Sequence, residues 1–142
     1  MQDGRIVYKG SINTSLSFRQ LHDVIDRAMK YTGNKDEEWF TDSLSEDIVV
    51  NATMKLKSDL ATINRLHYQI KFSKNEQGYH FQIDSVKLLQ KERGYKTTSV
   101  SSEELIKNLD DTGPIASASE KQLNEIDMRI QQLMDLLHNY SK

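Results

Sequence analysis

The side chains that could carry chemistry in this chain are its histidines and the carboxylates near them. The sequence of 142 residues contains the histidines His22, His67, His80 and His138, and it contains no cysteine. A thiolate nucleophile, a disulfide and a cysteine-ligated zinc site are therefore excluded. The sequence also has no glycine-rich phosphate loop, no G-x-S-x-G or H-E-x-x-H motif and no EF-hand loop. The remaining candidate for a chemical site is a histidine beside a carboxylate.

A predicted β-hairpin determines which carboxylate that would be. Large apolar residues recur at every second position on both sides of the polar run 73–78: Leu66, Tyr68, Ile70, Phe72, Tyr79, Phe81 and Ile83. This alternation predicts two strands with one buried face. We predict that Phe72 faces Tyr79, because this register keeps every large apolar side chain on the same face. The alternation changes phase after Ile83, which predicts a β-bulge at Asp84-Ser85.

The predicted register places His67 opposite Asp84. Such a pair could be a base held in one tautomer, or half of a metal site. His80 would lie roughly 13 Å away along the strand, whereas zinc needs three or four ligands within about 2.3 Å of one point. We therefore favour an exposed cross-strand pair over a catalytic or metal site, and we expect no cofactor.

The polar residues of the hairpin form a candidate partner-binding face. They are His67, Gln69, Lys71, His80, Gln82 and Asp84. They could bind a ligand or peptide through hydrogen bonds, or they could simply face water, as one side of an antiparallel sheet commonly does. We favour the solvated face. Nucleic acid is not expected, because the aromatic residues lie in the other phase and the net charge is -2.

Other segments supply the elements around the hairpin. Ser17 and Gln20 form a capping-box pattern at the start of a helix predicted over 17–32, which Gly33 would end. Strands are expected over 5–10, 38–41 and 48–56, and a short capped helix over 101–109. The run 97–99 reads as a loop. The sequence thus predicts an α+β fold, with an antiparallel sheet of four to five strands packed against the N-terminal helix.

A long C-terminal helix is predicted from near Ser117 or Ser119. Its apolar residues follow a regular spacing of three and four: Leu123, Ile126, Ile130, Leu133, Leu137 and Tyr140. This stripe could pack on the sheet, or it could bind a protein partner or form a homodimer; we favour packing within the chain. We expect residues 1–100 to form the core and residues 101–142 to form a helical extension that packs on it.

Targeting signals are not apparent in this sequence. No stretch is long and apolar enough to span a membrane. The chain begins Met1-Gln2-Asp3-Gly4, without the basic and apolar regions of a signal peptide.

Four segments carry a resemblance to a known bacterial family: 7–10 (VYKG), 28–31 (AMKY), 66–71 (LHYQIK) and 78–84 (GYHFQID). The chain resembles the domain of unknown function with a TATA-binding-protein-like (TBP-like) fold that occurs in secreted or lipid-anchored proteins of Bacteroides-type bacteria. The resemblance implies that fold and an extracytoplasmic location, and it implies no activity or catalytic residues.

These observations favour a non-enzymatic binding or interaction module of the bacterial cell envelope. Two alternatives stay open. One is a small-molecule-binding or enzymatic domain that uses the polar face around His67 and Asp84. The other is a structural or oligomeric role for the C-terminal helix.

Overall fold

A computed structural model describes residues 6–12, 16–42, 44–56, 62–76, 78–92, 96–111 and 113–141. In these ranges the elements follow the order β1 (Tyr8–Ile12), α1 (Phe18–Tyr31), β2 (Asn34–Asp42), β3 (Asp47–Lys55), β4 (Thr62–Asn75), β5 (Gly78–Glu92), β6 (Thr97–Ser101), α2 (Ser102–Asn108) and α3 (Pro114–Tyr140). The predicted α+β class is confirmed. The sheet has six strands rather than four or five.

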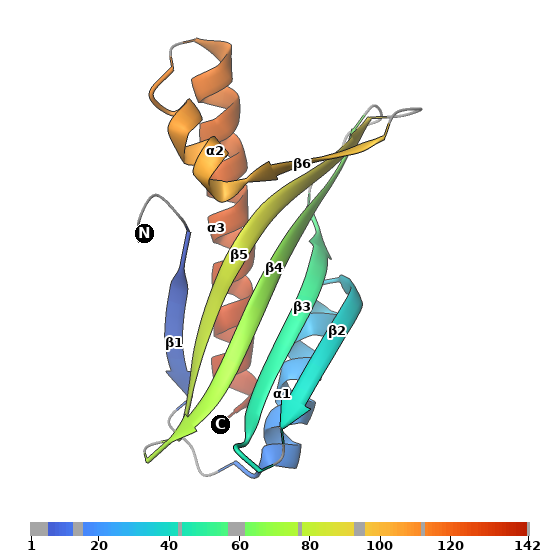
Figure 1. Cartoon of the computed structure of the whole chain (residues 1–142), viewed down its shortest axis with the longest axis vertical. Helices are drawn as coiled ribbons and strands as arrows, with labels where there is room; N and C mark the ends of the chain where they lie inside the picture. The colour runs from blue at the N-terminus through green and yellow to red at the C-terminus, as the bar shows by residue number, and fades with distance from the viewer. Residues whose placement is uncertain are drawn as a thin grey trace.

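The sheet is antiparallel throughout and is covered on one side. Its strand order is β1-β5-β4-β3-β2, and β6 pairs with β5. Strand β1 pairs with residues 79–83 of β5 and β6 pairs with residues 87–91, so the two short strands share one edge. Helices α1 and α3 lie behind the sheet in Figure 1, and no helix lies in front of it.

Helix α1 begins and ends where the sequence predicts. The hydroxyl of Ser17 accepts a hydrogen bond from the backbone N–H of Gln20, and the Gln20 side chain accepts one from the backbone N–H of Ser17. The capping box therefore satisfies two N–H groups that the helix leaves free. Gly33 follows the helix with a φ of 75°. The buried face of α1 comprises Leu21, Val24, Ile25, Ala28 and Met29.

Helix α3 begins earlier than the serine pattern indicates. It starts at Pro114, with Gly113 as its N-cap residue, because proline fits the first turn of a helix and lacks an N–H that would need a partner there. Its apolar stripe lies in the core: Ile126, Ile130, Leu133 and Leu137 are all 0% exposed, and Leu123 and Tyr140 pack against them. Packing within the chain is confirmed. The alternative of a protein partner or homodimer through Leu123, Ile126, Ile130, Leu133 and Leu137 stays a prediction; the last four side chains are buried within this chain.

A polar cluster joins α3 and the sheet to the end of α1. Arg129 donates through Nη2 to the carbonyl oxygen of Thr32 at 2.6 Å. Asn34 donates to the carbonyl oxygen of Met29 and accepts a hydrogen bond from the Tyr68 hydroxyl. Burial is the largest cause that raises the pKa of this hydroxyl. The cluster supplies partners to carbonyl groups that the helix end would otherwise leave unsatisfied.

The register of the β4–β5 hairpin differs from the prediction by two residues. Phe72 lies opposite Phe81 rather than Tyr79, and the ladder extends to the pair Asn75 and Gly78. The polar run thus continues both strands instead of forming a long loop. A shift of two residues keeps every side chain on the same face, so the alternation could not separate the two registers. The rings of Phe72 and Phe81 form a cross-strand pair with centroids 5.6 Å apart.

The predicted bulge is confirmed. Gln69 lies opposite Asp84 and His67 opposite Lys87, so the single residue Tyr68 faces the pair 85–86 of β5. Ser85 adopts a φ of 54°, in the left-handed region that L-residues rarely occupy. Beyond the bulge, β5 continues to Glu92. The predicted loop at 97–99 is wrong: these residues begin β6, where β-branched threonines suit an edge strand.

Candidate functional site

The candidate site lies on the side of the sheet away from α1 and α3, which we call the open face. The strand register arranges the side chains of this face in cross-strand rows, and four of these rows contain the candidate residues: Phe40–Val49–Lys71–Gln82–Lys9; Glu38–Asn51–Gln69–Asp84; Thr53–His67–Lys87–Ser101; and Ser73–His80–Ser11. All six residues of the predicted polar face are in these rows. The structure therefore brings them onto one surface, although not in the predicted pairs.

The predicted pair of His67 and Asp84 is wrong. The register shift and the bulge place His67 beside Lys87, and they place Asp84 beside Gln69. Burial, followed by the charge of Lys87, lowers the pKa of His67, and Glu38 opposes this effect weakly. A neighbouring cation disfavours the imidazolium, whereas a neighbouring carboxylate would stabilise it. The environment needed for a histidine–carboxylate base is therefore not present at this position.

In the middle of the open face, polar side chains contact one another. Gln69 donates through Nε2 to Oδ1 of Asn51 at 2.9 Å. The ring nitrogen Nδ1 of His67 lies 3.4 Å from the hydroxyl of Thr53. These contacts join side chains that are direct cross-strand neighbours, as the sheet geometry favours. They occupy part of the hydrogen-bonding capacity that a ligand would use.

The β1 end of the open face differs from the middle in shape and in charge. A depression of about 440 Å³ is lined by Lys9, Gly10, Lys71, Ser73, His80, Phe81 and Gln82. The lining contains two lysines and no carboxylate. Nε2 of His80 pairs with the side-chain amide of Asn75, on the neighbouring strand. Lys9 and Ser73 are not among the site residues predicted from the sequence, because neither strand order nor hairpin register can be read from local alternation.

A second cavity, of about 290 Å³, lies at the bulge. It is lined by Ile6, Val7, Gln82, Asp84, Ser85, Val86, Lys87, Ser101, Ser102 and Glu103. The space lies where β5 passes from its pairing with β1 to its pairing with β6. It mixes two carboxylates with a lysine, and so it has no single charge preference. In the ranges that the structure describes, no three His, Asp or Glu side chains are grouped as a metal site would require.

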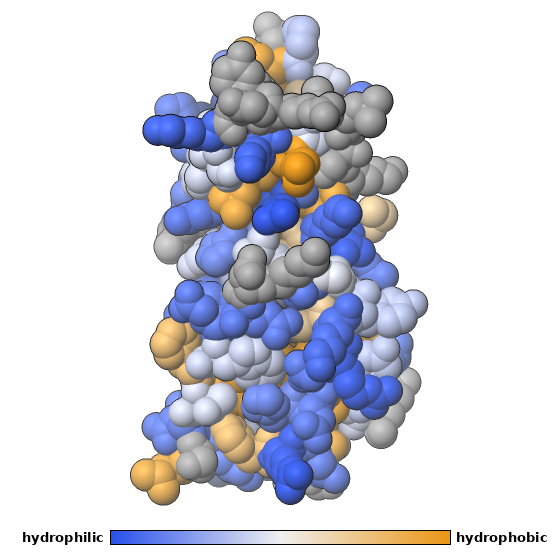
Figure 2. Space-filling model, turned by 90° about the vertical axis from the view of Figure 1, so that its right-hand side faces the viewer, coloured by the Kyte–Doolittle hydropathy of each residue, from blue (hydrophilic) through white to orange (hydrophobic). Residues whose placement is uncertain are grey.

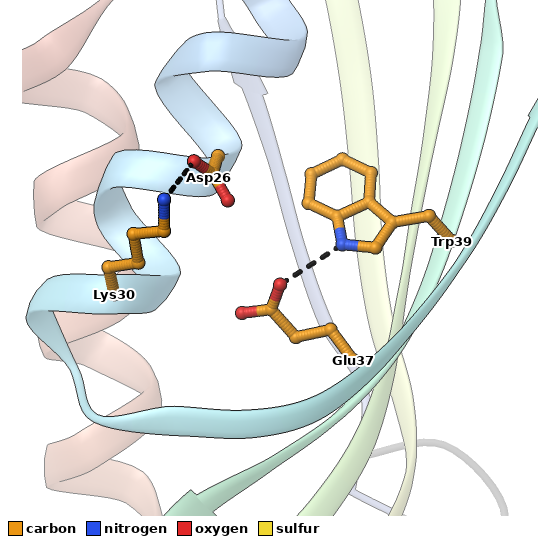
Figure 3. A network of polar contacts seen from close by, with 4 residues as sticks. All are labelled: Asp26, Lys30, Glu37 and Trp39. Carbon is orange, nitrogen blue, oxygen red and sulfur yellow. Dashed lines mark hydrogen bonds and ion pairs between the residues drawn. The ribbon is translucent and has the colours of Figure 1, made fainter.

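The acidic strand β2 forms the other edge of the sheet. Its tryptophan lies on the side of the sheet that the helices cover. Trp39 stacks on His22 of α1 with ring centroids 4.3 Å apart, and its Nε1 donates to Glu37 at 3.1 Å. Figure 3 shows the hydrogen bond between Trp39 and Glu37 beside the ion pair of Asp26 and Lys30 on α1. On this side of the molecule, apolar residues stand in small separate groups among polar ones (Figure 2). Trp39 therefore packs against α1, and the four rows of the open face contain no tryptophan.

Comparison with known proteins identifies the fold. No protein-family model and no curated protein sequence matches the chain. Among solved structures, a TBP-like protein from Parabacteroides distasonis superposes with a TM-score of 0.73, over 99% of this chain and 95% of that one, at 16% identity. The chain has a TBP-like fold. A DUF4468 family protein from Bacteroides ovatus also matches, with a TM-score of 0.59 and 16% identity, over 96% of this chain and 88% of that one.

The TBP-like fold confirms the structural part of the resemblance seen in the sequence. At 16% identity the likeness concerns the fold alone, and a fold does not define an activity. None of the helices in the described ranges is both long enough and apolar enough to cross a membrane.

Proposed function

We propose that the protein is a non-enzymatic binding module and that its open face recognises a ligand. The observation that carries this proposal is the asymmetry of the sheet. One face is covered by α1 and α3, whereas the other presents cross-strand polar rows and a depression at its β1 end. Backbone hydrogen bonds to the neighbouring strands fix the position of each central strand, which suits a preformed recognition surface.

An enzymatic role on the same face has less support. The histidine that could act as a base lies beside a lysine, and its pKa is lowered mainly by burial. In the middle of the face, the polar side chains of Gln69 and Asn51 hydrogen-bond to each other and are not directed at a common point where a substrate could react. Binding of a ligand by hydrogen bonds and charge does not require several reactive side chains to point at one atom.

We further propose that this module works in the bacterial cell envelope. The sequence resemblance is to secreted and lipid-anchored proteins, and the similar structures come from Bacteroidales. We regard residues 1–100 as the unit that presents the open face and 101–142 as the extension that covers its other side. Fractionation of the producing cells, followed by antibody detection, tests the location: recovery with the cytoplasmic fraction contradicts it.

The binding proposal is tested by mapping ligand contacts on the full chain. Uniformly ¹⁵N-labelled protein is titrated with a panel of sugars, nucleosides, amino acids, small acids and short peptides, and amide shifts are recorded by NMR. We expect perturbations confined to residues of the four rows. Gln69→Ala should weaken binding at the middle rows, whereas Gln131→Ala on the exposed side of α3 should not. Perturbations confined to the helical side, or none with any ligand, would overturn the proposal.

A further inference from the structure

We infer that the depression at the β1 end of the open face binds an oxyanion, the phosphate or carboxylate group of a small ligand. This inference rests on the proposed function and specifies which chemistry the open face recognises. We call this depression the Lys9–Lys71 site. Besides the two lysines, its lining provides Ser73, His80 and Gln82.

The register gives the site its geometry. Lys9 on β1 and Lys71 on β4 are both cross-strand partners of Gln82 on β5, so they flank the same residue. Two strand spacings put their Cα atoms about 10 Å apart. Lysine has a four-carbon stem and three donors, so both ammonium groups can reach an anion centred above β5. The neighbouring row places Ser73 and Ser11 on either side of His80, and Ser73 contributes a hydroxyl group to the lining.

The two lysines of the site differ from Lys74 and Lys30 in their ion pairing. Lys74 lies three positions after Lys71 and forms an ion pair with Glu46 at 2.6 Å, and Lys30 pairs with Asp26 at 2.9 Å. Among the ion pairs of the described residues, Lys9 and Lys71 take part in none. An anion in the depression would lie between two lysines, neither of which is ion-paired with a described carboxylate.

The nearest carboxylate along β5 belongs to Asp84, which forms no ion pair with either lysine in the described ranges. Asp84 accepts hydrogen bonds from Nε2 of Gln82 at 2.7 Å and from the hydroxyl of Ser85, and it lines the cavity at the bulge instead. His80 lies on the opposite side of Gln82 from Asp84. Its Nε2 is engaged by Asn75, so the other ring nitrogen is the one left to donate to a ligand.

The dimensions suit a small ligand rather than a single ion. A volume of about 440 Å³ lies within the range of roughly 300 to 1,000 Å³ that is common for ligand sites. The two charges lie on an exposed strand surface, where water and salt weaken them. We therefore expect the anionic group alone to bind in the millimolar range.

The test uses the ¹⁵N-labelled full chain, titrated with inorganic phosphate and with succinate at an ionic strength held constant by sodium chloride. Amide shifts should concentrate at Lys9, Ser73, His80 and Gln82, with saturation. Lys9→Gln and Lys71→Gln should each weaken binding about fivefold, and the double variant roughly 25-fold, from the loss of one or two charges near the anion. Lys55→Gln is the matched control, since Lys55 is an exposed lysine of β3 in another row of the same face.

The outcomes separate this inference from the broader one. Tighter binding of phosphate identifies a phosphorylated ligand and tighter binding of succinate a carboxylate ligand, and either supports the site. Shifts no larger than those in sodium chloride alone, or equal losses in Lys55→Gln and Lys71→Gln, overturn the Lys9–Lys71 site. If neutral members of the ligand panel still perturb the open face, the proposed function stands without the anion site. Circular dichroism of each variant confirms that a lost signal reflects lost binding and not unfolding.

Discussion

Replacing Arg129 with methionine tests how the helical layer is held behind the open face. The guanidinium of this α3 residue donates to the carbonyl oxygen of Thr32, at the end of α1, at 2.6 Å. A longer contact of 3.5 Å joins the same nitrogen to the carbonyl oxygen of Lys55 at the end of β3, and Nη1 donates to Gln132. One side chain thus joins three elements. Methionine keeps much of the apolar stem and removes the charge and the donors.

The expected cost follows from opposing contributions. A hydrogen bond to a charged group contributes about 1.5–3 kcal/mol, and a cation near a helix C-terminus adds about 0.3–1 kcal/mol. Against this, Nε of Arg129 is buried without a partner among the described residues, and removing it relieves about 1–2 kcal/mol. The loss of the carbonyl contacts outweighs that relief. We expect Arg129→Met to lower the free energy of unfolding by about 2 kcal/mol.

Urea denaturation measures this loss, with the fluorescence of Trp39, the single tryptophan, as the probe. A change of about 2 kcal/mol should move the midpoint by about 1 M urea. Arg129→Lys should recover part of the loss, because an ammonium lacks the planar fork that reaches two acceptors. Lys121→Met, at an exposed position of α3, should change stability by less than about 0.5 kcal/mol. An equally small change in Arg129→Met would refute the role assigned to the guanidinium.

Two further predictions concern the open face. Ser85→Gly should stabilise the protein by about 0.5–1 kcal/mol, because relief of a left-handed backbone costing about 1–2 kcal/mol exceeds the entropy that glycine adds to the unfolded chain; a lower melting temperature would contradict the bulge geometry. The lowered pKa of His67 means that the unfolded chain takes up this proton more readily than the folded one. Stability should therefore fall as the pH drops below about 6.5, and His67→Gln should reduce that fall; an unchanged pH profile of melting temperature would count against it.

Local chemistry in the sequence was enough to predict several elements. The side-chain hydroxyl of Ser17 and the side chain of Gln20 determine where α1 begins, and both contacts are present. The phase change after Ile83 indicated the bulge, because an extra residue on one strand must appear as a break in alternation. The spacing of apolar residues in α3 likewise predicted a buried stripe. In each case the cause and its effect lie within a few residues of each other.

What the sequence could not supply was pairing between distant segments. The two hairpin registers differ by two residues and bury the same side chains, so polarity alone could not choose between them. The polar residues 97–99 looked like a loop, yet β5 offers them an unpaired edge beyond the bulge. An edge strand has few buried side chains, and so its sequence carries little of the alternation that reveals a strand.

The same limit applies to function on a polar face. Gln69 is satisfied by Asn51, its cross-strand neighbour, so its polarity is explained without a ligand. Lys9 and Lys71 are far apart in the sequence, and they lie in one row only because both strands pair with the same residue, Gln82, of β5. A polar side chain with a partner in its own row supports the sheet, whereas lysines that share a row without a described carboxylate partner leave charge for a ligand to neutralise. The proposed recognition surface therefore rests on the strand register, which one residue type at a time cannot reveal.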